Sequence, residues 1–136
     1  MRLFLYLSFL VLFLACSEET KQHDPIANEP KVSEKTLLIA KKWFVFEVYA
    51  DGILSENPNW AGVSFEIRTN KTYTIINPIG KEEGTWTFDK NETVLVLDNG
   101  SDIKVVYNIL NLNEKELVLE GFDGIVTTKI IFKPFG

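Results

Sequence analysis

Few side chains in this 136-residue sequence belong to the types that perform covalent or metal chemistry. There is one cysteine, Cys16, and one histidine, His23, and both precede any patterned segment. Serine and cysteine nucleophiles usually need a histidine base, and zinc sites need clusters of cysteine or histidine. The eight glycines are scattered at expected turns and form no phosphate-binding loop. We therefore expect no catalytic residue, no metal site and no cofactor, and we interpret the protein as a non-enzyme.

Carboxylates are the remaining chemical candidates, and one of them lies in a strongly apolar segment. Glu47 has the same parity as Val45 and Tyr49 in an expected strand. Either this face of the strand points inward, or the other face does and Glu47 is solvated. A carboxylate enzyme would need two inward acidic residues. The alternation offers at most this one.

Cys16 ends a short apolar segment at the start of the chain. Residues 3–14 are apolar except for Tyr6 and Ser8, and Arg2 precedes them. A membrane-spanning helix needs about 20 apolar residues, so this run has the length of a signal peptide. With Ala15 directly before the cysteine, the segment resembles the signal and lipobox of bacterial lipoproteins. We predict a signal peptide over residues 1–15 and attachment of lipid, such as palmitate, at Cys16. The alternative is an ordinary secretory signal in which the cysteine is incidental.

Residues 16–32 are polar, contain two prolines and show no apolar period, which predicts a flexible tether. Ser17-Glu18-Glu19 resembles the export signal of surface-exposed lipoproteins of Bacteroidota. We therefore expect a lipid-anchored protein of the outer membrane at the cell surface, with the periplasmic face as the alternative. The net charge of -5 argues against nucleic acid as a partner. It also argues against adsorption to anionic lipid, so the expected contact with the membrane is the lipid on the cysteine.

Residues 33–136 are predicted to form one all-β domain. Ser33 is a suitable N-cap for a short helix over residues 33–42, in which Leu37, Leu38 and Ala40 could cover one end of the domain. From Trp43 onward the apolar period is two, and turn signals recur every eight to twelve residues. Eight strands are expected, over residues 43–50, 63–68, 72–77, 83–88, 93–98, 103–110, 116–120 and 126–133. Short sequential connections favour an eight-stranded antiparallel up-and-down barrel with a short N-terminal helix.

Two segments depart from the simple alternation of this barrel. The first strand is apolar on both faces, so we expect the helix or a loop to lie outside it. Residues 51–62 form the longest loop and contain Ile53, Leu54 and Trp60. One interpretation is that this apolar loop serves as a lid or as a contact for a partner. The other is that Trp60 folds back and plugs the barrel.

The order and spacing of several motifs resemble the lipocalin-like domain of small Bacteroidota lipoproteins over about residues 37–134. The motifs are Trp43 at the start of the first strand, the Gly-Thr-Trp-Thr-Phe segment at residues 84–88, and the Glu-Leu-Val-Leu segment at residues 116–119. The resemblance implies a calycin-type barrel with a binding role and no catalytic residues. It implies a small hydrophobic or glycan-like ligand, for which the expected lining residues are Trp43, Trp60, Phe65, Tyr73, Trp86 and Tyr107.

The size of these side chains leaves a second interpretation open. Eight strands enclose just enough space for side chains or for one small ligand. If the aromatic residues fill the interior, the protein acts instead as an interaction or envelope-accessory module. Small inhibitor-type lipoproteins are an example of that class. Its partner would then be an unidentified envelope protein, for which the acidic charge suits a basic surface.

Overall fold

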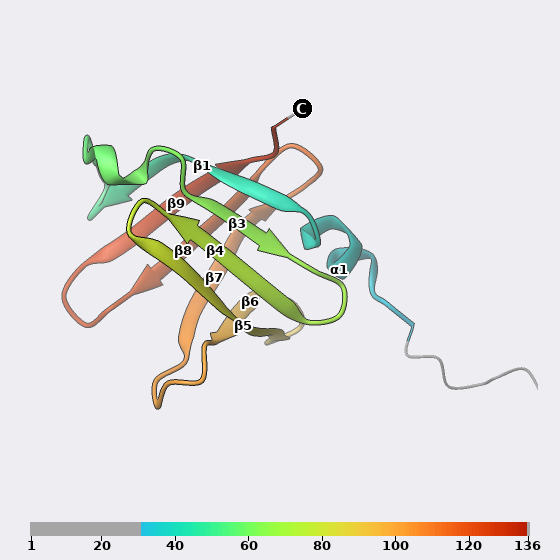
Figure 1. Ribbon diagram of the computed structural model, residues 1–136. Helices are drawn as coiled ribbons and strands as arrows, with labels where there is room; N and C mark the ends of the chain where they lie inside the picture. Colours follow the sequence, from blue (N-terminus) through green and yellow to red (C-terminus); the bar gives the residue numbers. More distant parts are fainter. Residues whose placement is uncertain (1–30, 136) are drawn as a thin grey trace, which may run out of the picture. The chain divides into compact units, whose positions relative to one another are not determined.

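The computed structural model describes residues 31–135, so the predicted signal peptide (1–15), Cys16 and most of the tether (16–32) lie outside the described residues. The described part consists of strands, one short α-helix and one 3-10 turn (Figure 1). In chain order these elements are α1 (Glu34–Ile39), β1 (Lys42–Ala50), β2 (Ile53–Leu54), η1 (Pro58–Trp60), β3 (Ser64–Ile67), β4 (Thr72–Asn77), β5 (Gly80–Asp89), β6 (Val94–Asp98), β7 (Val105–Leu112), β8 (Leu117–Phe122) and β9 (Thr127–Lys133).

The strands close into a barrel. Each strand from β3 to β9 pairs antiparallel with the next, β1 pairs with β3, and β1 also pairs with β9. The two-residue β2 adds to β1 at the edge of this closed sheet. Closure leaves no unpaired strand edge among the eight barrel strands, so their backbone hydrogen bonds are satisfied within the barrel. The predicted all-β architecture, an eight-stranded antiparallel up-and-down barrel with a short N-terminal helix, is confirmed.

Helix α1 is shorter than predicted and buries a different face. Ser33 is its N-cap and accepts a hydrogen bond from the Thr36 amide at 3.1 Å, as expected. The helix ends at Ile39 because the carbonyl of that residue turns to accept the Trp43 indole N–H at 2.8 Å. Thr36 and Ile39 are the buried residues, whereas Leu37 is 59% exposed. The prediction that Leu37 covers the barrel end is therefore wrong.

Helix α1 closes one end of the barrel (Figure 1). Its residues and the short link after it reach the three turns at that end. The Ser33 hydroxyl donates to the Glu92 carboxylate at 2.5 Å, the Lys71 ammonium donates to the Thr36 hydroxyl at 3.5 Å, and the Lys41 ammonium donates to the carbonyl of residue 114 at 3.4 Å. Contacts to three separate turns hold the helix across this end of the barrel rather than along its wall.

The outer face of β1 is consequently less covered than the sequence predicts. Phe46 is 56% exposed, and the ammonium group of Lys133 lies over its ring, at 3.6 Å from the centroid. Phe44 meets the ring of Phe135 edge-on, with the centroids 4.3 Å apart. The expected cover is therefore supplied only in part, by the C-terminal segment and not by the helix.

A bulge in β1 decides the orientation of Glu47. The pairing of β1 with β9 shifts register between Val45 and Glu47, so the inward position after Val45 is Val48, which is 4% exposed. The Glu47 carboxylate points to the outer face, where it accepts a hydrogen bond from Tyr49 at 2.8 Å. An extra residue in one strand reverses the parity that follows it. Of the two alternatives for Glu47, inward or solvated, the structure therefore shows the solvated one.

Candidate functional site

The end of the barrel opposite α1 is built from four connections. Because the strands alternate in direction, the segments 51–63, 78–79, 99–104 and 123–126 all lie at this end. We call this end the mouth. The connections at the closed end are tied down by α1, whereas the mouth segment 51–63 carries only the three-residue 3-10 turn η1. Ligand sites of small barrels occur at such open ends.

An apolar cavity of about 120 Å³ lies inside the barrel near the mouth. Its wall comes from eight elements and the residue before β3, and the lining residues are Val45, Trp60, Val63, Phe65, Ile75, Leu97, Tyr107, Leu119, Ile130 and Phe132. Trp60 of η1 is half-buried and packs against the core, so it folds back onto the barrel as one of the two interpretations of this loop predicted. At about 30 Å³ per water, the cavity alone has room for about four water molecules.

A wider cleft of about 460 Å³ lies at the mouth beside this cavity. It is formed by the start of β7, the end of β8 and their loops, with Ile103, Val106 and Phe122 among the residues that line it. Tyr107 lines both the cleft and the cavity, so its ring stands between them. The cleft has the volume of a small-molecule site, roughly 300–1,000 Å³, which the inner cavity does not reach by itself.

Two glycines at inward positions make room for two tyrosines at this level of the barrel. A Cβ atom on Gly84 would lie 2.8 Å from Cε1 of Tyr73, and one on Gly121 would lie 2.9 Å from Cε1 of Tyr107. Real Cβ atoms do not approach other carbons so closely. Each tyrosine ring therefore lies over the glycine of the neighbouring strand, in space that the side chain of any larger residue there would occupy.

One carboxylate, Glu82, faces the interior beside these tyrosines. It pairs directly with Ile75 across β4 and β5, and directly paired residues share a face. The Tyr73 hydroxyl donates to the Glu82 carboxylate at 2.7 Å. Burial, and secondly this hydrogen bond to Glu82, hold the pKa of Tyr73 well above its usual value. Burial, and secondly the charge of Glu82, raise the pKa of Tyr107 as well.

Sequence reasoning missed Glu82 because the predicted strand began three residues too late, directly after Glu82. The expected strand over residues 83–88 is in fact β5, Gly80–Asp89. The signal was present in the alternation, since Trp86 and Gly84 are inward and the next position of that parity is Glu82. The predicted strand over residues 103–110 is also displaced and runs Val105–Leu112. Its outward Val106 and Leu110 remain about half exposed, at 53% and 52%.

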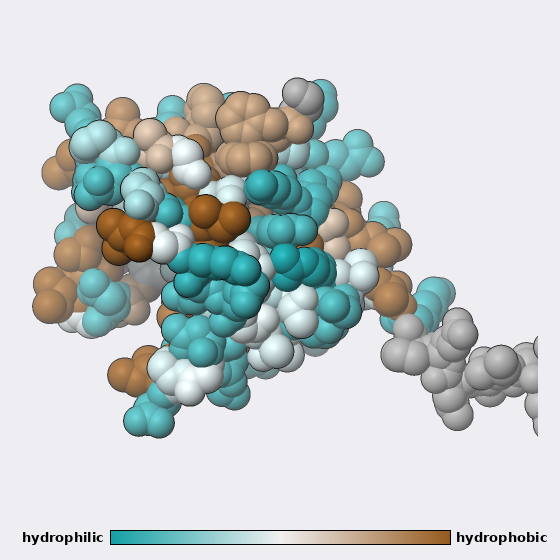
Figure 2. All heavy atoms as spheres, viewed as in Figure 1, coloured by the Kyte–Doolittle hydropathy of each residue, from teal (hydrophilic) through white to brown (hydrophobic). Residues whose placement is uncertain are grey.

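The rim of the mouth carries large apolar side chains on each of its four connections. Ile53, Ile79, Ile103 and Ile125 are 74–95% exposed, one on each connection. Figure 2 shows hydrophobic side chains standing out at the end away from α1, with hydrophilic groups between them. Isolated apolar side chains are ordinary on protein surfaces, but a set at one end marks a contact region.

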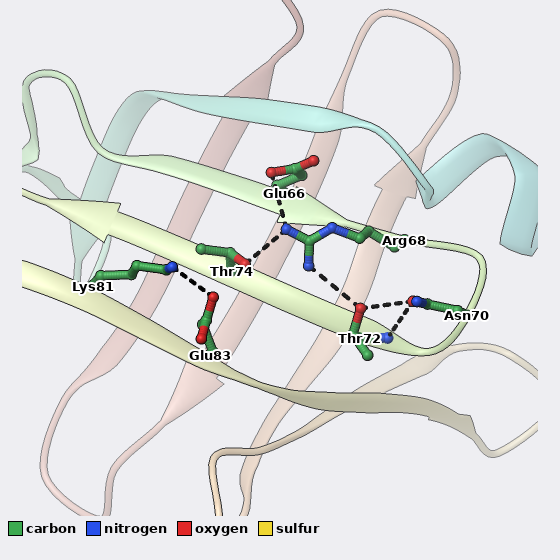
Figure 3. Close-up of polar contacts among 7 residues, drawn as sticks. All are labelled: Glu66, Arg68, Asn70, Thr72, Thr74, Lys81 and Glu83. Atoms are coloured by element: carbon green, nitrogen blue, oxygen red, sulfur yellow. Dashed lines mark hydrogen bonds and ion pairs between the residues drawn. The ribbon is translucent and has the colours of Figure 1, made fainter.

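The outer wall next to Glu82 is polar and internally paired (Figure 3). Glu83 points to the opposite face from Glu82 and forms an ion pair with Lys81 at 2.7 Å, which lowers the pKa of the Glu83 carboxyl. On β3 and β4, the Arg68 guanidinium donates to Glu66 at 3.1 Å and to Thr74 at 2.8 Å. The two neighbouring glutamates of β5 therefore differ in surroundings, one outward with a lysine and one inward with tyrosines.

The structure brings only some of the predicted ligand-lining residues together. Trp60, Phe65 and Tyr107 line the cavity, and Tyr73 packs against Phe65 with the ring centroids 5.8 Å apart. Trp43 and Trp86 lie outside the cavity lining and belong to the filled half of the barrel. Both are fully buried, and their indole N–H groups donate to backbone carbonyls of Ile39 and Arg68. Cys16, the predicted lipidation site, lies outside the described residues.

Among residues 31–135, no three histidine, cysteine, aspartate or glutamate side chains are placed to hold a metal ion. No helix within that range is both long and apolar enough to cross a bilayer.

The family of the chain follows from comparison with known proteins. A family model described as the lipocalin-like domain matches residues 39–119, which span α1's last residue to β8 and include the mouth residues Glu82 and Tyr107. The chain belongs to the lipocalin-like domain family. The predicted resemblance is therefore confirmed. No curated protein matches this lipocalin-like chain in sequence.

Two solved structures share the lipocalin-like fold. One is a lipocalin-like protein from Bacteroides uniformis, with 19% identity and a TM-score of 0.54 over 71% of this chain and 98% of that chain. The other is a DUF4847 family protein from Bacteroides vulgatus, with 16% identity and a TM-score of 0.53 over 74% of this chain and 96% of that chain. At these identities the likeness concerns the fold alone.

Proposed function

We propose that this lipocalin-like protein is a lipid-anchored lipoprotein of the outer membrane, exposed at the cell surface, that binds a small hydrophobic ligand at its mouth. The observation that carries the ligand proposal is the apolar cavity under Trp60, which adjoins a cleft of about 460 Å³ through Tyr107. A ligand would place an apolar group in the cavity and its remainder in the cleft. The apolar lining of the cavity supports a hydrophobic group there rather than the glycan-like alternative.

The anchoring proposal rests on the N-terminal sequence and has an all-or-none test. Replacing Cys16 by serine removes the only thiol of the chain. Without it no thioether to lipid can form, and the protein has no lipid to hold it at the membrane. We expect wild-type protein to incorporate labelled palmitate and to sediment with membranes, and the C16S variant to do neither. Protease treatment of intact cells then distinguishes the surface from the periplasmic face. Equal membrane retention of the variant would refute the anchor.

The ligand proposal predicts that filling the cavity weakens binding without unfolding the barrel. Val45 lines the cavity, and methionine at this position has the length and flexibility to occupy its volume. We expect native mass spectrometry of protein purified gently from its host to show a small-molecule adduct on the wild type. The adduct should be lost in Val45→Met. The matched control is Val96→Met on the half-buried outer face of β6, which should keep the adduct.

A solid-core interaction module is retained as the second candidate because four isoleucines stand exposed around the mouth. In that case the rim contacts an envelope protein and the interior stays closed. Crosslinking on intact cells distinguishes the interaction module from the ligand-binding barrel. The crosslinker is placed at Ile79 on the rim and, for comparison, at Leu37 near the closed end. A specific protein captured only from Ile79, together with the absence of any adduct in native mass spectrometry, would favour the interaction module.

A further inference from the structure

The inward carboxylate of Glu82 has no ion-pair partner among residues 31–135, although it lies in a mostly apolar interior. Its one hydrogen-bond donor there is the neutral Tyr73 hydroxyl. The neighbouring lysine, Lys81, is on the opposite face of β5 and pairs with Glu83. A charged group that is half-buried gains stabilisation from an opposite charge, and the described part of the chain does not supply one here.

The surroundings of Glu82 suit a positively charged nitrogen. The rings of Tyr73 and Tyr107 are held in place against Gly84 and Gly121, and Phe65 meets Tyr73 edge-on. Aromatic faces attract ammonium groups through their quadrupoles, and this attraction increases when water is excluded. Tyr73 is fully buried and orients Glu82 through its hydroxyl, so the Glu82 carboxylate and the half-buried ring of Tyr107 are the two kinds of group that bind an ammonium ion. The apolar cavity begins directly beside them, at Ile75.

The charges of the rim point to the same ligand class. Segments 51–63, 77–83, 98–104 and 122–126 contain seven carboxylates and only two lysines. Both lysines are paired, Lys81 with Glu83 at 2.7 Å and Lys104 with Asp98 at 3.7 Å. The remaining carboxylates give the mouth a negative potential, which raises the local concentration of cations and lowers that of anions.

We propose that the mouth selects an amphiphilic cation, whose ammonium nitrogen is bound by the Glu82 carboxylate and the ring of Tyr107 and whose apolar group enters the cavity under Trp60. This inference rests on the proposed ligand-binding function and adds the charge of the ligand to it. A fatty acid or another anionic amphiphile would bring its negative group against Glu82 and would be excluded.

The test compares three probes of equal chain length: hexyltrimethylammonium, hexanoate and hexanol. Calorimetric titrations use the protein as made by a bacterial host, held in nanodiscs, with empty nanodiscs as the blank. We expect hexyltrimethylammonium to bind most tightly and hexanoate least. Glu82→Gln should weaken binding of the cation about tenfold and leave that of hexanol unchanged. The matched control is Glu83→Gln, one residue away on the outer wall, which should change neither.

Each outcome bears on a separate claim. Glu82→Asp keeps the charge and should retain the preference for the cation, which guards against a folding defect in the glutamine variant. If the cation and hexanol bind equally and Glu82→Gln changes nothing, the charge selectivity is refuted while hydrophobic binding stands. If none of the three probes binds, and Val45→Met and the wild type give the same result in native mass spectrometry, both the charge selectivity and the proposed ligand-binding function are refuted.

Discussion

Replacing Gly84 by alanine will destabilise the barrel by about 3 kcal/mol or more, because a methyl group has no space at this position. The added Cβ would lie 2.2 Å from the backbone carbonyl oxygen of Asp98 on the neighbouring strand and 2.8 Å from the Tyr73 ring. A backbone oxygen in a paired strand cannot turn aside as a flexible side chain can. We therefore expect a marked fall in the midpoint of urea unfolding, measured by tryptophan fluorescence.

The same strand contains the matched control for this substitution. Gly80 begins β5, and nothing lies within 4 Å of a Cβ atom built on it. Alanine at this position reduces the conformational freedom of the unfolded chain and causes no clash in the folded one. Gly80→Ala should therefore leave the free energy of unfolding unchanged or raise it by about 0.4 kcal/mol. Equal effects of the two substitutions would show that β5 and β6 are not packed as closely as described.

Replacing Trp43 by alanine will cost about 4 kcal/mol and will release α1 from the closed end. The indole is fully buried in the core, and its N–H donates to the Ile39 carbonyl at 2.8 Å. Truncation leaves a large cavity and removes the hydrogen bond that ends the helix. Chemical denaturation should report the loss of stability, and hydrogen exchange should report faster exchange of the α1 amides.

Two further variants separate the volume of the indole from its hydrogen bond. Trp43→Phe keeps most of the buried area and loses only the N–H, so we expect a smaller loss, about 1–2 kcal/mol. Trp60→Ala removes a half-buried indole at the other end and should destabilise less than Trp43→Ala while enlarging the cavity. Unchanged exchange of α1 in Trp43→Ala would contradict the role given to this tryptophan.

These results would follow from a division of the barrel into a filled half and a half that contains the cavity. The closed half contains Trp43 and Trp86, each fully buried and hydrogen-bonded to backbone. The mouth half contains smaller residues, the half-buried Trp60 and Tyr107, and the remaining space. A single eight-stranded barrel can thus be solid at one end and hollow at the other, so the two interpretations of its aromatic residues apply to different ends.

The sequence alone was sufficient for the architecture because the architecture depends on local and periodic features. Alternation of apolar residues, turn residues at regular intervals and short connections determine that neighbouring strands pair antiparallel. The predicted strand over residues 72–77 coincides with β4, Thr72–Asn77, and Ser33 is the N-cap of α1 as expected. The cysteine after the apolar run is likewise readable locally, and its lipidation stays a prediction.

The content of the barrel was decided by tertiary structure. A tryptophan lines the cavity or the filled core according to its distance, along the barrel axis, from the helix that closes the barrel. The alternation of apolar residues indicates only whether a side chain points inward or outward. The bulge after Val45 turned Glu47 outward, and three more residues at the start of β5 placed Glu82 inside. Sequence parity could not locate either change, because a shift of one residue in pairing costs little locally and reverses every side chain beyond it.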